Sequence, residues 1–274
     1  MRVAGLEKTS VKRDSELMNV AERVIAVLFV ILAMAPVLGF GQTDEIQVYD
    51  GSIAPPGKFN LTMHNNFTPA GINTPAFPGG LIPDKSLNGV TEWAWGVTKW
   101  FEAGLYLPLY SVSQHRGATI NGGKIRMLFA APHAADRSFF YAINFEFSYN
   151  SKHWDPRSFT SEIRPIIGLR LHRLDLIVNP ILDNSFVGGF KNLEFAPASR
   201  IAYELSPKWV VAVEEYGDVG LLHEFYPAGK QSHQLYGVLD HSSRFVNIEF
   251  GVGLGLTSTS DKVTIKLSLS RDLK

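Results

Sequence analysis

The sequence has no cysteine, no excess of either charge, and only one long apolar run. Its 274 residues include 26 Lys and Arg against 26 Asp and Glu. The lack of cysteine excludes a disulfide framework and thiolate metal sites, and it suits a protein exported through an oxidising compartment. The neutral balance provides no electrostatic footprint for nucleic acid. Because no apolar run of about 20 residues follows the N-terminal one, a bundle of transmembrane helices is also excluded.

The single apolar run predicts an export signal. Residues 24–40 read VIAVLFVILAMAPVLGF. The small residues Gly39 and Gly41 occupy the positions that a signal peptidase reads, so we expect residues 1–41 to be a signal peptide cleaved after Gly41. Met18 is an alternative start, because it begins a leader of usual length. An uncleaved membrane anchor is the other interpretation of this run.

The next stretch, residues 42–57, is expected to form a periplasmic N-terminal arm. It contains EIQVYDGSI and then Pro55-Pro56, the pattern of a short extended segment that stops before a strand. A plug inside a barrel is the functional alternative. A terminus that is merely tethered is the plainer one.

Residues 161–183 show the pattern that organises the rest of the chain. They read SEIRPIIGLRLHRLDLIVNPILD, in which apolar residues alternate with charged and small ones on both sides of His172-Arg173. Each arm has about ten residues, the length that a tilted strand needs to cross a bilayer. One face is almost purely apolar and the other carries charges. We therefore predict a transmembrane β-hairpin.

About twelve segments repeat this alternation, which predicts an all-β fold, an antiparallel transmembrane β-barrel of about twelve strands over residues 58–274. Besides the hairpin, the predicted apolar faces are Phe59/Leu61/Met63, Trp93/Trp95/Val97, Leu105/Leu107/Leu109, Ile125/Met127/Phe129, Phe139 to Tyr149, Leu193 to Tyr203, Trp209/Val211/Val213, Leu235/Gly237/Leu239, Val246 to Leu256 and Val263 to Leu269.

The predicted connections alternate between short and long. Tight links at residues 98–101, 172–173, 206–208 and 241–244 are followed by longer links rich in Gly, Pro and Asn at residues 68–89, 113–123, 150–160, 184–192 and 217–231. Short periplasmic turns and longer extracellular loops are typical of outer-membrane barrels. A soluble β-sandwich is the main structural alternative. The polar faces favour the barrel, because they mix charges with Ala and Gly and so suit a crowded lumen.

Charged residues on the predicted lumen face are the candidate site. They form either a constriction that selects solutes or an ionic network that fills and stiffens the barrel. The candidates are Glu92, Lys124, Arg126, Glu146, Glu162, Arg164, Arg170, Asp175, Glu194, Arg200, Glu204, Glu214, Glu249 and Lys266, with Asp183 on the same face.

The sequence offers little support for an enzyme. His241 and Ser243 have the His-x-Ser spacing used by outer-membrane lipid hydrolases, but they lie in a predicted periplasmic turn without an acidic partner. The eight histidines are scattered, so no metal site is expected. The glycines of residues 251–255 lie in a strand, where they reduce the bulk of one lumen wall rather than bind phosphate. We predict neither catalytic residues nor a cofactor.

Three stretches carry a resemblance to a known family. They are TEWAWGVTKWFEAGLYLPL at residues 91–109, SPKWVVAVEEYGD at residues 206–218 and GVGLGLTSTSDKVTIKLSLSRDL at residues 251–273. They resemble the uncharacterised outer-membrane barrels grouped with the MetA-like transporters of phenol meta-pathways. The resemblance implies a monomeric barrel that passes small, apolar or aromatic molecules, and it supplies no catalytic residues.

The function expected from the sequence is thus an outer-membrane transporter or channel for small molecules. The expected partners are outer-membrane lipid, the barrel-assembly machinery during biogenesis and an unidentified solute, with no nucleic acid. A closed structural or surface-interaction barrel is the alternative, and a lipid hydrolase using Ser243 and His241 is the third hypothesis.

Overall fold

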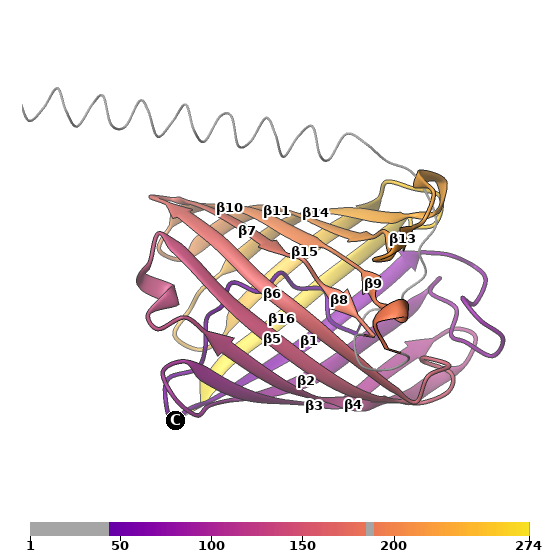
Figure 1. Cartoon of the computed structure of the whole chain (residues 1–274), viewed down its shortest axis with the longest axis horizontal. Helices are drawn as coiled ribbons and strands as arrows, with labels where there is room; N and C mark the ends of the chain where they lie inside the picture. Colours follow the sequence, from indigo (N-terminus) through magenta and orange to yellow (C-terminus); the bar gives the residue numbers. More distant parts are fainter. Residues whose placement is uncertain (1–43, 185–188, 274) are drawn as a thin grey trace, which may run out of the picture. The chain divides into compact units, whose positions relative to one another are not determined.

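Alternating polar and apolar residues fold into a closed antiparallel barrel of twelve strands, as the sequence predicted. The structure is a computed structural model that describes residues 44–184 and 189–273. The predicted signal peptide lies outside the described residues. The barrel closes where the first strand, β1 (Phe59–Ala70), pairs with the last, β16 (Val263–Leu273). Figure 1 shows the tilted strands of the wall.

Several of the twelve wall strands are divided, because a short β segment continues the main one at one end of the barrel. The number of β segments is therefore larger than twelve. The remaining segments are β2 (Ser86–Gly96), β3 (Phe101–Ser113), β4 (Gly117–Ala130), β5 (Phe139–Asn150), β6 (Phe159–Leu171), β7 (Leu174–Asn179), β8 (Leu182–Asp183), β9 (Glu194–Phe195), β10 (Ala198–Ser206), β11 (Trp209–Asp218), β12 (Gly220–Leu221), β13 (Glu224–Phe225), β14 (Ser232–His241) and β15 (Asn247–Gly255), with 3₁₀ turns η1 (Ala134–Asp136), η2 (Phe190–Asn192) and η3 (Ala228–Lys230).

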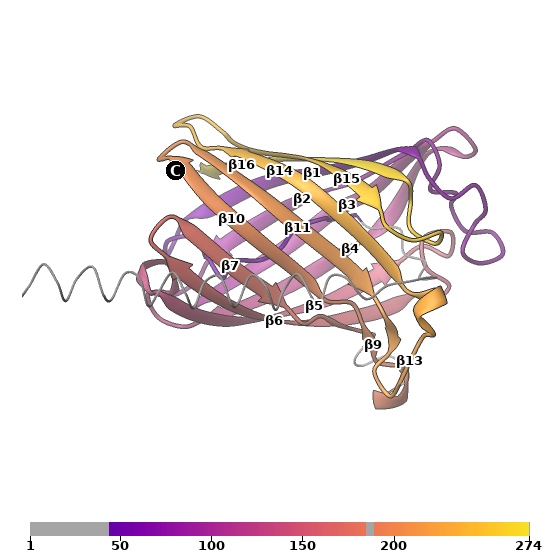
Figure 2. The same cartoon turned by 90° about the horizontal axis from the view of Figure 1, so that it is seen from above.

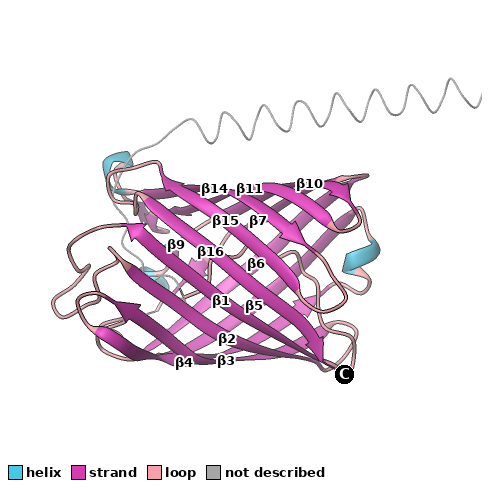
Figure 3. Ribbon diagram, turned by 180° about the vertical axis from the view of Figure 1, so that it is seen from behind, coloured by secondary structure: helices cyan, strands magenta, loops and turns pink. Residues whose placement is uncertain are grey.

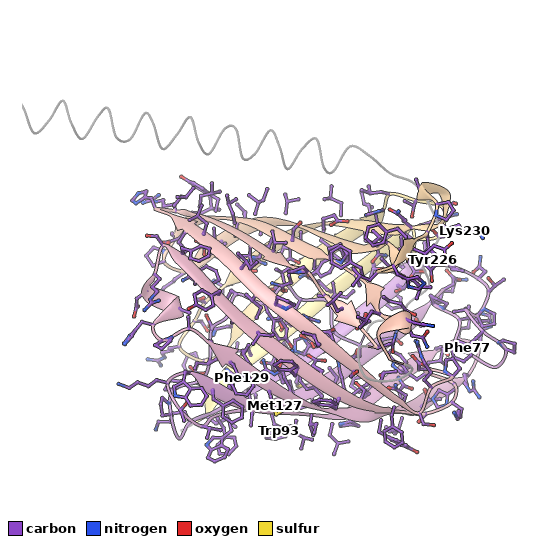
Figure 4. All side chains as sticks on the ribbon, in the orientation of Figure 1. Phe77, Trp93, Met127, Phe129, Tyr226 and Lys230 are labelled. Carbon is purple, nitrogen blue, oxygen red and sulfur yellow. The ribbon has the colours of Figure 1, made fainter. Side chains whose placement is uncertain are left out.

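The outside of the wall is apolar. Phe59, Met63 and Phe67 on β1 are each exposed by 41–47%, while Thr62, His64, Asn66 and Thr68 on its other face are buried. Exposed aromatic rings of Trp100, Phe139, Trp209 and Phe245 mark the end with the tight links. Figure 4 labels Trp93, Met127 and Phe129 on the wall and Tyr226 and Lys230 among the loops at the other end. An apolar exterior around a polar interior is the arrangement that a bilayer requires. Among the described residues, no helix has the length and apolarity to cross a membrane.

Two details of the sequence-based pattern are wrong near the end of β3. Leu109 was placed on the apolar outer face, but it is 1% exposed and faces the lumen. The pairing of β3 with β4 shifts between Tyr106 and Leu109, and this bulge reverses the phase of the alternation. Residues 113–123 were expected to form a long loop, whereas only residues 114–116 link β3 to β4. Strand β4 already includes Thr119 and Ile120, although the Gly and polar residues of this stretch are typical of a loop.

The wall is interrupted where two prolines lie opposite each other. Regular pairing of β7 with β10 ends at Asn179 and Ala198, and that of β8 with β9 begins at Leu182 and Phe195. Pro180 and Pro197 fall between these pairs, and neither has an N–H to donate to the ladder. The strand predicted as continuous through Pro180 is therefore divided into β7 and β8. Beyond the break, β9 and β13 belong to a lobe at the loop end of the barrel (Figure 2).

The segment before β1 lies inside the barrel. We call residues 44–56 the inserted segment. The extended pattern predicts a periplasmic arm or a plug, and these residues lie in the lumen, where Glu45, Val48 and Tyr49 are each at most 6% exposed. Figure 1 shows the segment as an indigo trace within the barrel, and Figure 3 shows the wall from behind. This position agrees with the alternative of a plug inside the barrel, between which and an arm the extended pattern could not decide.

Candidate functional site: the occupied lumen

Side chains of the barrel wall bind the main chain of the inserted segment. Asn179 on β7 donates from Nδ2 to the carbonyl of Tyr49 (3.0 Å) and accepts from the N–H of Tyr49 at its Oδ1 (2.7 Å). Asn66 donates to the carbonyl of Asp44 (2.9 Å), and Arg164 donates to that of Gln47 (3.1 Å). Polar main-chain groups that are buried need partners of this kind.

Two further main-chain contacts fix the end of the segment nearest β1. The N–H of Ala54 donates to Glu102 Oε2 (2.5 Å), and the N–H of Gly57 donates to the carbonyl of Gly96 (2.7 Å). Glycine is required at position 96, because a Cβ there would lie 2.1 Å from the carbonyl oxygen of Ala54. The wall is therefore shaped for the close passage of a backbone.

Apolar side chains of the inserted segment pack in two clusters on the lumen wall. Ile46 packs in a cluster with Ala202, Ala212, Tyr236 and Val238. Val48 and Tyr49 pack in another cluster, whose other members include Leu128, Phe140, Ile166 and Ile177. The segment thus packs against two parts of the lumen wall at once. Burial of these side chains stabilises the segment in addition to its hydrogen bonds.

Ion pairs fill the middle of the barrel around the segment. Arg126 on β4 contacts Glu92 (2.6 Å) and Glu102 (2.5 Å), and Glu92 also contacts Nε2 of His64 (3.1 Å). Arg126 is 5% exposed. Removing one partner of such a buried pair leaves an uncompensated charge, which is strongly destabilising.

A second group of ion pairs joins the wall to the segment itself. Lys124 contacts Asp44 (2.8 Å) and Glu146 (3.1 Å). The hydroxyl of Tyr49 lies 2.6 Å from that of Tyr106 and donates to Glu146 (3.3 Å). Burial raises the pKa of Tyr49 well above its usual value, so the hydroxyl stays protonated and can donate.

A third group lies on the strands from β10 to β16. Arg200 contacts Glu214, Asp240 and Glu249, and Lys266 contacts Glu214 and, at 2.7 Å, Glu249. Lys266, which is 2% exposed, also donates to the carbonyl of Ile46 (3.3 Å). The group therefore binds the segment as well as the wall.

The remaining candidates form separate ion pairs or none. Arg164 contacts Glu162 (2.6 Å) and Arg170 contacts Asp175 (3.4 Å), while Glu194 contacts Arg157 (3.5 Å). Glu204 is exposed beside the tight link at residues 207–208, and no ion pair of its side chain is found among the described residues.

Several residues of this site were missed by the sequence analysis. Glu102 and Asp240 alternate with the predicted apolar faces, so the same pattern could have found them. His64 lies among Asn and Thr residues on a face with no other charge. No sequence pattern indicates that Asp44, Glu45 and Tyr49 belong to this site, because no periodicity places the inserted segment within the barrel.

The inserted segment separates two cavities. The larger has a volume of about 480 Å³ and reaches Asn60, Ser270 and Asp272, at the end with the tight links; we call it the inner chamber. The smaller has a volume of about 320 Å³ and reaches Trp154 and Asp218, at the end with the loops; we call it the outer chamber. Gln47 lines both chambers. The two chambers therefore meet at this residue.

His241 and Ser243 serve the turn between β14 and β15. The hydroxyl of Ser243 donates to the carbonyl of Val246 (2.7 Å) and accepts from the N–H of Phe245 (3.3 Å). The ring of His241 lies 4.2 Å from that of Trp209, centroid to centroid. Among the described residues, no hydrogen bond joins this serine to a base, and no group of three His, Asp or Glu residues could hold a metal ion.

Comparison with known proteins identifies the fold. No protein-family model matches the sequence, and no curated protein matches it. The structure is similar to the COG4313 outer membrane channel from Pseudomonas putida F1, at 12% identity and a TM-score of 0.56, over 84% of this chain and 100% of that one. It is also similar to the KdgM porin in complex with disordered oligogalacturonate, at 8% identity and a TM-score of 0.51, over 78% and 99% of the two chains.

The chain has the fold of an outer-membrane barrel. In this fold the short turns face the periplasm and the longer loops face the exterior, so the inner chamber opens toward the periplasm and the outer chamber toward the cell surface. The apolar exterior agrees with a location in the outer membrane.

Proposed function

We propose that this outer-membrane barrel is a channel or transporter for small molecules and that its inserted segment holds it closed. The observation that carries the proposal is the pair of chambers that enter the lumen from opposite ends and are separated at the inserted segment. The segment is bound by side chains rather than by the sheet ladder. It can therefore leave without breaking the wall.

The lining of both chambers favours polar solutes. The inner chamber is lined by Asp50, Asp175 and Asp240, and the outer chamber by Asp155 and Asp183, among other polar side chains. Apolar or aromatic solutes, which the family resemblance implies, stay a prediction without support from this lining. The KdgM porin was solved with oligogalacturonate, a polyanion. A lumen rich in carboxylates does not favour that ligand here.

Single-channel recording tests the proposal. The mature chain, residues 42–274, and a variant that lacks residues 44–53 would be refolded and inserted in planar bilayers. We expect rare openings of the intact barrel and discrete, frequent conductance steps from the variant. Silence from both, with heat-modifiable migration showing folded barrels, would refute the channel.

A closed structural barrel is the second candidate, because buried ion pairs such as Arg126 with Glu102 also fill the lumen (2.5 Å). The same recordings separate the two candidates, since a closed barrel stays silent after the deletion.

We further propose a monomer, delivered by a signal peptide cleaved after Gly41 and inserted by the barrel-assembly machinery. The closed sheet supports the monomer, because pairing of β1 with β16 leaves no long edge strand for a second chain. Mass spectrometry of the exported protein tests the cleavage site, and light scattering in detergent tests the oligomeric state.

A further inference from the structure

Three carboxylates from neighbouring strands form a row in the outer chamber. Glu162 on β6 lies opposite Asp183 on β8, and Asp183 lies opposite Glu194 on β9. All three side chains line the chamber, and Asp218 at the end of β11 lines it as well. Since adjacent strands are about 4.8 Å apart, the row of three extends over about 10 Å.

Basic side chains do not balance the acids of this chamber. Eight Asp and Glu residues line it, against Lys124, Arg157 and Arg164. Arg164 is bound to Glu162, and Arg157 is shared between Asp155 and Glu194. Among the described residues, Asp183 makes no ion pair with any of these cations. The chamber therefore has a surplus of carboxyl groups over basic side chains.

The inserted segment adds a buried carboxylate to the same chamber. Glu45 lines the chamber, its side chain is 2% exposed, and neither carboxylate oxygen has a hydrogen-bond partner among the described residues. Its ion pair with Lys124 is long, at 3.9 Å, and Lys124 contacts Asp44 and Glu146 more closely. A buried carboxyl whose oxygens lack hydrogen-bond partners is costly unless a ligand or a proton satisfies it.

We propose that the outer chamber binds small organic cations that carry ammonium groups. This inference rests on the proposed function, because it names the class of solute that the channel admits. An amine with two ammonium groups fits a row of carboxylates better than a bare metal ion does, because the described residues contain no group of three ligands arranged for a metal. Each ammonium group has three donors for carboxylate oxygens.

Calorimetric titration of the full mature barrel with 1,4-diaminobutane at low ionic strength tests the proposal. Succinate, a dianion of similar length, is the control ligand. The test variant is Asp183→Asn with Glu194→Gln. The matched control is Glu224→Gln, which removes an exposed carboxylate that does not line the chamber. Heat-modifiable migration confirms that each variant is folded, and Asp183→Asn alone replaces the double variant if that one fails to fold.

We expect the diamine to bind, succinate not to bind, and the double variant to bind the diamine about tenfold more weakly, because charge-assisted hydrogen bonds are lost. Glu224→Gln should leave the affinity unchanged. Equal affinity of the double variant and the parent, or binding of succinate as tight as that of the diamine, overturns the inference.

This titration needs no open pore. Diamine binding by a barrel that stays silent after the 44–53 deletion would reject the channel alone, whereas conductance without diamine binding would reject the cation site alone.

Discussion

Asn179 offers a direct test of what holds the inserted segment in the lumen. Its side chain makes both main-chain hydrogen bonds of Tyr49, at 2.7 and 3.0 Å, and it is 0% exposed. In Asn179→Ala both bonds disappear. At about 1 kcal/mol net for each bond, the variant should lose about 2 kcal/mol of docking free energy, which raises the undocked fraction about 30-fold.

A single introduced cysteine can report this change, because the chain has none of its own. Val48 is 5% exposed, so a cysteine at position 48 should react with a water-soluble maleimide only after the segment undocks. In the regime where docking is fast, the reaction rate follows the undocked fraction. We expect Asn179→Ala to speed the labelling of this cysteine about 30-fold.

The matched control is Asn144→Ala. Asn144 is also a lumen asparagine with 0% exposure, but its Nδ2 donates to Glu146 (3.1 Å) rather than to the segment. It should leave the labelling rate within about threefold of the parent, since it removes no contact with the main chain of the segment. Similar acceleration by both variants would show that the wall, and not Asn179, controls docking.

Three further predictions follow from other contacts. Lys266→Met leaves Glu214 and Glu249 without this partner, so the free energy of unfolding in urea should fall by about 3–5 kcal/mol. The control Lys262→Met, at an exposed position, should change it by less than about 0.5 kcal/mol. Equal losses would refute the role of the ion pairs. Burial raises the pKa of Glu45 in the inserted segment, where the charged neighbours are His64, Glu146, Lys124 and Arg164. The docked segment therefore favours the protonated carboxyl. The contribution of Glu45 to the docking free energy is full below the usual carboxyl pKa and is lost as the pH rises through the pKa of the docked form. The rate of cysteine labelling at position 48, divided by that of the same cysteine in a free peptide, should thus be higher at pH 8 than at pH 5. Glu45→Gln should abolish this difference. A pH dependence that persists in Glu45→Gln would show that another group causes it. The purified barrel should not cleave phospholipid, and Ser243→Ala should only weaken the turn, by about 1 kcal/mol, because it removes hydrogen bonds to Val246 and Phe245; hydrolysis that Ser243→Ala removes would establish an enzyme.

Much of the barrel could be predicted because a membrane imposes a strict period of two. Most residues on the outer face of β1 and β16 are apolar because they face lipid, so Met63 and Ile265 reveal their orientation without any knowledge of their partners. The same constraint placed Glu92, Arg126 and Lys266 on the inner face.

The errors occur where the chain departs from regular pleating. At Leu109 a bulge reverses the alternation, and at Pro180 and Pro197 the break comes from two residues that are far apart in sequence. Neither feature is encoded in the period of one strand. Partners inside the lumen, such as Arg200 with Asp240, depend on the register of strands that are not consecutive.

The main-chain recognition of the inserted segment has an evolutionary consequence. Asn66, Arg164 and Lys266 bind carbonyl oxygens, which every amino acid carries, so substitutions at Asp44, Gln47 and Ile46 can accumulate without loss of these bonds. The wall residues have no such freedom. Related barrels should therefore keep the three wall donors while the sequence of the segment drifts, except that proline is barred from positions 49 and 54, whose N–H groups are donors.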